Sequence, residues 1–199
     1  MSVHSATVAP RQVLADLIPA TKVNARVRDA VLVVGGAALT GASAQIAIEI
    51  PAISPVPFVL TTLTVLLLGA AYGPVRAAAS MALYLAVGMA GVPWFTDGNH
   101  GAIPTLGYVI GFVVAAALVG SLARRGGDRT VLRTAGIMLL GTVAIYAVGV
   151  PYLVVSTGMT WTEGLMQGAA LFLVTDVIKL VVAAALLPGA WALVNRFTR

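Results

Sequence analysis

The chain has 199 residues, of which 59% are hydrophobic and only 10% are charged, with a formal net charge of +5 and a pI near 10.1. Soluble domains carry about 25% charged residues, so this chain has too few ionic side chains to cover a soluble globule, and soluble enzymes and binding modules are excluded. Cysteine is absent and there are only two histidines. We therefore expect no disulfide, no metal site and no cofactor.

Residues 1–29 form the only long polar stretch and are predicted to be a cytoplasmic N-terminal tail, with room for a short interfacial helix. Residues 30–48 then carry no charged side chain. At about 1.5 Å per residue they cover most of a hydrocarbon core of about 30 Å, which predicts a first membrane span. A signal peptide cleaved near Ala42, Ser43 and Ala44 is the alternative. The length of the polar leader and the apolar spans that follow disfavour cleavage.

Five further spans are predicted at residues 58–73, 74–92, 105–123, 134–156 and about 171–191. Pro74 suits the first turn of a helix, where its missing N–H costs nothing. Thr160 and Glu163 have the spacing of a capping box, which predicts a short interfacial helix ending near Gly168, ahead of the last span. The fold class is therefore an all-α polytopic membrane protein, with residues 30–199 forming a domain of six transmembrane helices.

The basic residues of the loops all fall on one side of this topology. They are Arg11, Lys22, Arg26 and Arg28 in the tail, Arg76 in the second loop, Arg124, Arg125, Arg129 and Arg133 in the fourth loop, and Arg196 and Arg199 at the C-terminus. Because cytoplasmic loops are enriched in Lys and Arg, both termini are predicted to be cytoplasmic. The positive charge thus marks the cytoplasmic side of the membrane, where it can meet lipid. We therefore expect membrane lipid and no nucleic acid as a partner.

Small residues recur at intervals that let helices approach closely. The pairs are Gly69 and Gly73, Gly107 and Gly111, and Gly164 and Gly168, for which we expect packing inside the bundle. A further small face in the first span is made of Gly36, Ala38, Ala42 and Ala44. This face either packs inside the bundle or docks another membrane protein.

Asp176 and Lys179 are the two charged side chains inside the predicted spans, and their spacing places them on one helix face. Each costs on the order of 2.5–3.5 kcal/mol at the centre of a span, so neither is expected to face lipid. The pair either satisfies itself and fixes the bundle, or it forms a polar ligand site or ion path. Asp176 would lie about 8 Å below the outer surface, within reach of an external ligand.

The third outer loop, residues 91–101, combines aromatic, amide and carboxylate groups with glycines. This composition predicts a binding lid that includes Phe95 and Asn99. An interfacial aromatic belt is the alternative for Phe95 and Tyr108. Thr62 lies among the threonines that open the second span and is a weaker candidate. No Gly-Lys dipeptide occurs, so the chain carries no P-loop for ATP hydrolysis.

Several motifs, in this order and spacing, resemble the BioY family, the biotin-binding S components of energy-coupling factor (ECF) transporters. They are Pro55-Val56-Pro57, Tyr84-Leu85-x-x-Gly88-x-x-Gly91-Val92-Pro93-x-Phe95, Pro104-Thr105-x-Gly107-Tyr108-x-x-Gly111-Phe112 and Asp176-x-x-Lys179. The resemblance implies biotin uptake across the plasma membrane of a prokaryote by a protein that is not an enzyme. It also implies a transmembrane coupling protein and two ATP-binding-cassette (ABC) ATPases as partners.

By this resemblance, Asp176 and Lys179 match the two residues of the family that contact the ureido head of biotin. Gly107 and Tyr108 match the family's Gly-Tyr after the third outer loop. Phe95, Asn99 and Thr62 are further candidates for substrate binding, and the small face of the first span is where such proteins dock the coupling protein. The chain departs from the family pattern at Val59, Thr61 and Ile103.

Two other functions remain as rivals to this prediction. The first is an ion-coupled secondary carrier for biotin or another small vitamin, in which Asp176 takes up a proton. The second is an intramembrane enzyme or assembly factor. One Asp and one Lys three residues apart provide no nucleophile with an oriented base, which disfavours the second.

Overall fold

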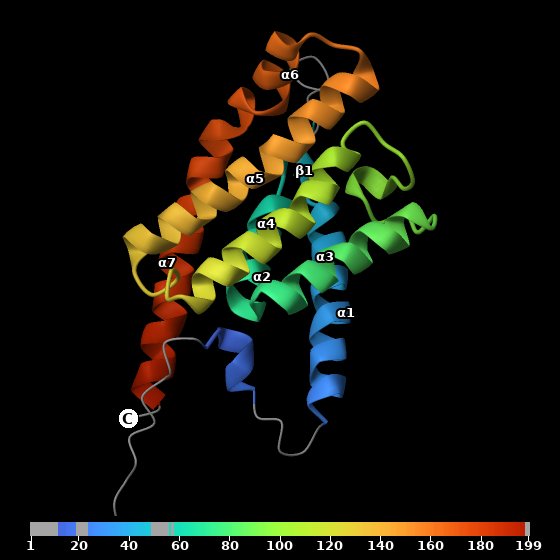
Figure 1. The fold of residues 1–199 in the computed structure, drawn as a ribbon. Coiled ribbons are helices and arrows are strands. Elements are labelled where there is room, and N and C mark those ends of the chain that lie inside the picture. Colours follow the sequence, from blue (N-terminus) through green and yellow to red (C-terminus); the bar gives the residue numbers. More distant parts are fainter. Residues whose placement is uncertain (1–11, 19–23, 49–55, 57, 198–199) are drawn as a thin grey trace, which may run out of the picture.

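A computed structural model describes residues 12–18, 24–48, 56 and 58–197, and most of these residues are helical (Figure 1). The helices are the 3-10 helix η1 (Leu14–Leu17), α1 (Ala25–Ala44), α2 (Thr61–Tyr72), α3 (Pro74–Met89), the 3-10 helix η2 (Thr96–Gly98), α4 (Leu106–Arg124), α5 (Val131–Thr157), α6 (Trp161–Gly168), the 3-10 helix η3 (Ala170–Phe172) and α7 (Leu173–Phe197). Two short strands, β1 (Ala47–Ile48) and β2 (Phe58–Val59), pair antiparallel. The predicted all-α class is confirmed.

Four stretches of the described chain are long and apolar enough to cross a membrane: Ala25–Ala44, Leu106–Arg124, Val131–Thr157 and Trp161–Arg196. The other two predicted spans correspond to α2 and α3, which have 12 and 16 residues. A helix of 12 residues covers about 18 Å, well short of a hydrocarbon core of about 30 Å. The break between them lies at Gly73, whose φ of 79° turns the chain, and at Pro74, which begins α3 without an N–H.

Two predicted boundaries differ from the structure. The first span was expected to end at residue 48, but α1 ends at Ala44, and Ala47 and Ile48 pair with the strand before α2. The same helix starts earlier than predicted, because the Asn24 side chain accepts a hydrogen bond of 3.0 Å from the Arg26 N–H and caps it. The end of the predicted tail therefore belongs to α1.

The helix α6 begins where the sequence predicted it. The backbone N–H of Thr160 donates to Glu163 at 2.8 Å, and the Glu163 N–H donates to the Thr160 hydroxyl at 3.3 Å. This capping box is confirmed. The irregular backbone of Ala169 and the 3-10 helix η3 then separate α6 from α7.

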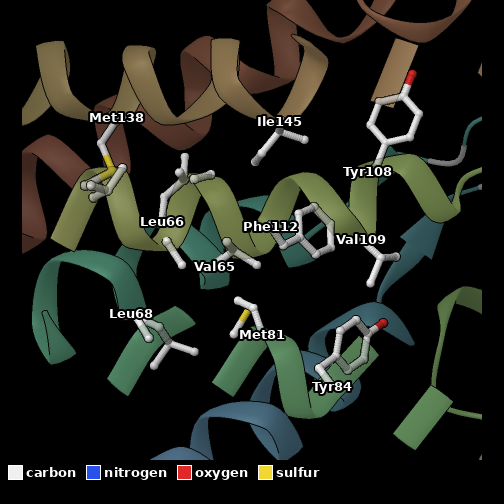
Figure 2. Packing of buried hydrophobic residues seen from close by; sticks show 14 of the residues in the cluster. Val65, Leu66, Leu68, Met81, Tyr84, Tyr108, Val109, Phe112, Met138 and Ile145 are labelled. Atoms are coloured by element: carbon white, nitrogen blue, oxygen red, sulfur yellow. The ribbon is translucent and has the colours of Figure 1, made fainter. Parts of the chain in front are cut away.

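Helix α4 lies at the centre of the bundle and packs against α2, α3 and α5 (Figures 1 and 2). Glycine permits this close approach. A Cβ at Gly120 would lie 2.5 Å from the Pro74 nitrogen, and a Cβ at Gly111 would lie 2.9 Å from the Ile145 carbonyl oxygen. The expected internal packing of the glycine pairs is thus seen at Gly111. Around these contacts, side chains of α2, α3, α4 and α5 form one apolar core (Figure 2).

The small face of α1 divides into two parts. Gly36 and Ala44 are buried, and a Cβ at Gly36 would lie 2.6 Å from the hydroxyl oxygen of Ser80 in α3. These two residues therefore pack inside the bundle, which is one of the two roles predicted for this face. Ala38 and Ala42 are exposed.

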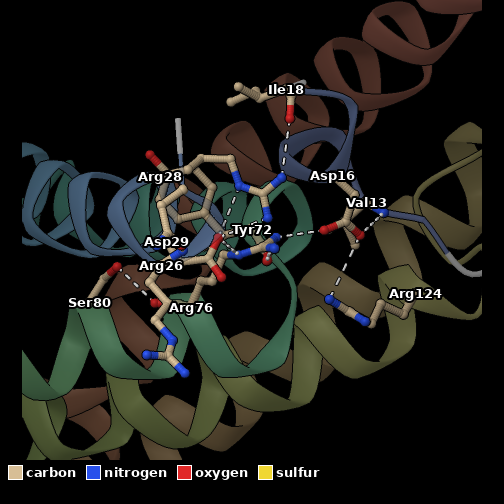
Figure 3. A network of polar contacts seen from close by, with 11 residues as sticks. Val13, Asp16, Ile18, Arg26, Arg28, Asp29, Tyr72, Arg76, Ser80 and Arg124 are labelled. Carbon is tan, nitrogen blue, oxygen red and sulfur yellow. Dashed lines mark hydrogen bonds and ion pairs between the residues drawn. The ribbon is translucent and has the colours of Figure 1, made fainter. Parts of the chain in front are cut away.

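The segment around η1 packs against the ends of α2, α3 and α4 (Figure 3). Val13 and Ala15 are buried, with exposed fractions of 0% and 4%. The Asp16 carboxylate accepts a hydrogen bond of 2.6 Å from Arg76 and lies 3.7 Å from Arg124. Part of the predicted tail is therefore folded onto the bundle.

A second carboxylate extends this network. Asp29 at the start of α1 lies 2.9 Å from Arg76 and 3.0 Å from Arg28, and Arg28 also donates to the carbonyl of Ile18 at 3.1 Å (Figure 3). The segment that precedes α1 and the turn between α2 and α3 are thus held by shared ionic contacts.

The loop between α4 and α5 is joined to α7 by a buried acid. The Trp191 indole N–H donates to Asp128 at 2.6 Å, and the Arg129 guanidinium lies 3.4 Å from the centre of the Trp191 ring. Burial raises the pKa of Asp128 despite the bond from Trp191 and the charge of Arg129. Arg129 also donates to the carbonyl of Gln12 at 2.8 Å, so this loop is tied to the η1 segment as well.

The ionic contacts of Asp16 predict a pH-dependent stability. Burial raises the pKa of Asp16, but the hydrogen bond and charge of Arg76, the N–H of Val13 and the charge of Arg124 outweigh burial and hold the pKa below its usual value. A lowered pKa stabilises the fold above the unfolded-state pKa, and this stabilisation is lost as pH falls through the folded-state pKa. We expect Asp16→Asn to lower stability by about 1 kcal/mol at neutral pH and by much less near pH 3.

Thermal unfolding in detergent at both pH values measures this difference. Asp97→Asn is the matched control, because Asp97 is exposed in an outer loop and has no ion pair among the described residues. An Asp16→Asn variant that is destabilised equally at both pH values would contradict the assignment.

Candidate functional site

A pocket of about 620 Å³, measured out to its open mouth, lies between α2, α3, α4, α5 and α7. Its lining residues are Val56, Val59, Thr61, Thr62, Tyr84, Phe95, Thr96, Ile103, Thr105, Tyr108, Val109, Phe112, Tyr146, Gly168, Phe172, Asp176 and Lys179. The lining is mostly apolar, with its charged groups confined to α7.

The polar end of the pocket is built from three helices. On α7, Lys179 Nζ lies 3.3 Å from Asp176 Oδ1, and it also donates to the Thr62 hydroxyl of α2 at 2.8 Å. From α5, the Tyr146 hydroxyl donates to Asp176 Oδ2. The side chains of Lys179 and Asp176 are 16% and 11% exposed. Asp176 and Lys179 thus pair with each other within α7, and both side chains still line the pocket.

Another part of the pocket wall is aromatic and comes from α3 and the loop of residues 91–101. The rings of Tyr84 and Phe95 pack edge to face with centroids 5.3 Å apart. Phe95 is 1% exposed and occupies the space that a Cβ at Gly88 would fill. The Trp94 indole N–H donates to the Tyr84 carbonyl at 2.9 Å, which fastens the loop to α3. The predicted lid therefore supplies part of the pocket wall.

The structure brings Thr62, Phe95, Tyr108, Asp176 and Lys179 into the pocket lining, as the sequence analysis grouped them. Their side chains come from α2, the third outer loop, α4 and α7. These elements are distant in sequence, so the grouping follows from the packing around α4.

Asn99 and Gly107 are not part of this lining. The Asn99 side chain is exposed and donates to the Thr96 carbonyl at 2.9 Å, because the loop backbone turns it away from the pocket. Gly107 is buried against Tyr152 and allows α4 and α5 to approach. Two neighbouring residues line the pocket instead. They are Thr96, which accepts the hydrogen bond from Asn99, and Tyr108, which follows Gly107 in the sequence.

Several lining residues were not among the candidates from sequence, and Tyr146, Phe172 and Thr61 are three of them. Tyr146 and Phe172 lie in apolar stretches without a pattern that separates pocket from core. Thr61 was noted only as a departure from a motif, but it is 2% exposed and its hydroxyl has no partner in the described part of the chain. An unpaired buried hydroxyl in a pocket is available to a ligand.

The sequence matches the BioY family over residues 18–196. The chain belongs to the BioY family. This confirms the resemblance carried by the sequence motifs.

Several BioY proteins and one solved structure align with most of this chain. It is 34% identical to the probable biotin transporter BioY of Lysinibacillus sphaericus over 160 residues, which cover 76% of this chain and 80% of the relative. It is 33% identical to the biotin transporter BioY of Rhizobium etli, over 66% of this chain and 76% of the relative. The S-component for biotin from an ECF-type ABC transporter has the same fold, with a TM-score of 0.75 at 23% identity over 84% of this chain and 92% of that chain.

The packing of Phe95 against Gly88 predicts that a larger residue at position 88 lowers the stability of the fold. Gly88→Ala would force the Phe95 ring out of its place, so we expect a loss of about 1–3 kcal/mol and a melting temperature lower by about 2–10 °C. Gly35→Ala is the matched control, because no atom lies within 4 Å of a Cβ at Gly35. Melting in detergent measures both, and equal melting temperatures for the two variants would contradict the packing described.

Proposed function

We propose that this chain captures biotin from outside the cell and delivers it inward as the S subunit of an ECF-type ABC transporter. It is a transporter subunit and not an enzyme. Family membership, the names of the relatives and the shared fold support the proposal. The observation that carries it is the ion pair of Asp176 and Lys179, held by two other helices and open to the pocket.

The chemistry of biotin complements this pocket. The ureido group has two N–H donors and one carbonyl acceptor, so the Asp176 carboxylate would accept from its N–H groups and the Lys179 ammonium would donate to its carbonyl. Such charge-assisted bonds are strong in a low dielectric. Thr62 would hold Lys179 in place, while Phe95 and Tyr108 would cover the apolar ring and chain.

The same groups would give selectivity. An analogue without the ureido N–H groups would bury Asp176 and leave its free acceptor positions without donors. An unpaired buried carboxylate weakens binding more than the loss of an apolar contact does.

The topology that goes with this function has six crossings and both termini in the cytoplasm, in the plasma membrane of a prokaryote. Residues 1–29 would lie on the cytoplasmic side, with the last of them in the first turns of α1, and residues 30–199 would form the six-helix domain. The basic residues support this orientation. Arg76, Arg124 and Arg129 all lie near the η1 segment, toward the lower end of Figure 1, whereas α6 lies at the upper end.

Energy for uptake would come from partners, since the sequence carries no P-loop of its own. The partners are a transmembrane coupling protein and two ABC ATPases. Ala38 and Ala42 offer an exposed small surface on α1, where another helix can approach closely. Uptake that collapses with a protonophore while ATP is held constant would contradict coupling to ATPases and favour an ion-coupled carrier.

The binding site has a direct test in equilibrium binding of radiolabelled biotin to the purified chain. We expect Asp176→Asn and Lys179→Ala each to weaken binding by about 30-fold or more, because each leaves the other charge without its partner. Glu163→Gln, on the exposed side of α6, serves as the control and should bind like the wild type. Undiminished binding by both site variants would refute the site, and a wild type that binds another vitamin but no biotin would refute the substrate.

The docking surface is tested separately from substrate binding. We expect Ala38→Trp combined with Ala42→Trp to lower copurification with the coupling protein and ATP-driven uptake by about tenfold, with biotin binding unchanged, because bulky side chains prevent close helix approach. Ala185→Trp places a bulky side chain on an exposed position of α7 and should retain both copurification and uptake. Equal losses in the α1 and α7 variants would show that α1 has no special role.

A further inference from the structure

Tyr146 of α5 is a pocket residue with a polar contact that the proposed function does not yet use. Its hydroxyl donates to Oδ2 of Asp176, whereas Lys179 approaches the other oxygen, Oδ1, at 3.3 Å. The two oxygens of this carboxylate are therefore held from two helices, one by a neutral hydroxyl and one by an ammonium.

Tyr146 is itself fixed in place by a neighbour. Its ring meets the Tyr108 ring edge to face, with centroids 6.3 Å apart and an interplanar angle of 84°. The Tyr108 hydroxyl donates to the Gly168 carbonyl at 2.8 Å. One turn further along α5, Gly149 lies against the Tyr108 ring with no room for a Cβ. The Tyr146 ring thus packs on Tyr108, with its hydroxyl directed at Asp176.

The remaining hydrogen-bonding capacity of the site follows from these contacts. A carboxylate has about four acceptor positions and an ammonium has three N–H donors. Tyr146 and Lys179 each use one position of Asp176, and Lys179 gives one donor to Thr62 and one to Asp176. One N–H of Lys179 and acceptor positions of Asp176 remain. This set complements a ligand group in which N–H donors flank a carbonyl, as in a cyclic urea.

That arrangement depends on how the carboxylate is rotated. Asp176 and Lys179 face each other on one helix, and a carboxylate free to turn would bring both oxygens toward the ammonium. A pair closed in this way satisfies itself and offers a ligand fewer acceptor positions. The bond from Tyr146 holds Oδ2 toward α5 and opposes this closure.

We propose that Tyr146 is a positioning residue for ligand recognition, which keeps the Asp176–Lys179 pair open so that a cyclic urea can bind to both charged groups. This inference rests on the proposed function in biotin uptake. It adds a determinant of specificity on α5, which acts through Asp176.

A double-mutant cycle with biotin binding to the purified full-length chain tests the inference. We expect Tyr146→Phe, which retains the ring against Tyr108, to bind about tenfold more weakly than the wild type. Asp176→Asn should bind more weakly still, and the double variant should bind no worse than Asp176→Asn alone. Tyr152→Phe removes a hydroxyl of the same helix outside the pocket lining and should bind like the wild type.

Each other result contradicts the inference. Unchanged binding by Tyr146→Phe would show that the hydroxyl does not position Asp176. If the double variant lost affinity by the product of the two single losses, Tyr146 and Asp176 would act independently. A loss of affinity in Tyr152→Phe equal to that in Tyr146→Phe would show a general effect on packing in α5. These results overturn the inference alone, whereas a wild type that does not bind biotin overturns the proposed function as well.

Discussion

The absence of water inside a membrane is the constraint on which this structure depends. Two charged side chains on α7 require partners from the protein itself, since lipid provides none. Thr62 and Tyr146 supply them from α2 and α5. The meeting point of these three helices is therefore fixed by polar contacts, and the pocket occupies the space next to it.

Close packing and charge act at different places in the fold. Glycines such as Gly111 and Gly149 let α4 and α5 pack closely next to the pocket residues Tyr108 and Tyr146. At the other end, Asp16 and Asp29 join Arg76 to the N-terminal segment. One end is thus shaped by apolar contact and open to a ligand, while the opposite end is closed by ion pairs.

The sequence predicted what local chemistry determines and missed what depends on helix geometry. The capping box at Thr160 and the spacing of Asp176 and Lys179 are local, so α6 and the ion pair were found. Tyr146 escaped because its contact with Asp176 depends on how α5 crosses α7. Asn99 was a candidate because of the composition of its loop, but it lies outside the pocket lining and donates to the Thr96 carbonyl. The end of α1 differed because Ala47 and Ile48 pair with Val59 and Phe58, a non-local contact that the local sequence does not predict.

The three tryptophans occupy three distinct environments. Trp94 packs on Tyr84, a pocket residue, with centroids 5.3 Å apart. Trp161 is 59% exposed on α6, and Trp191 is 2% exposed beneath Arg129 at the far end. Intrinsic fluorescence therefore carries separable information. Emission from Trp94 reports on the outer wall of the pocket, and emission from Trp191 reports on the ionic end, in a protein that needs no attached dye.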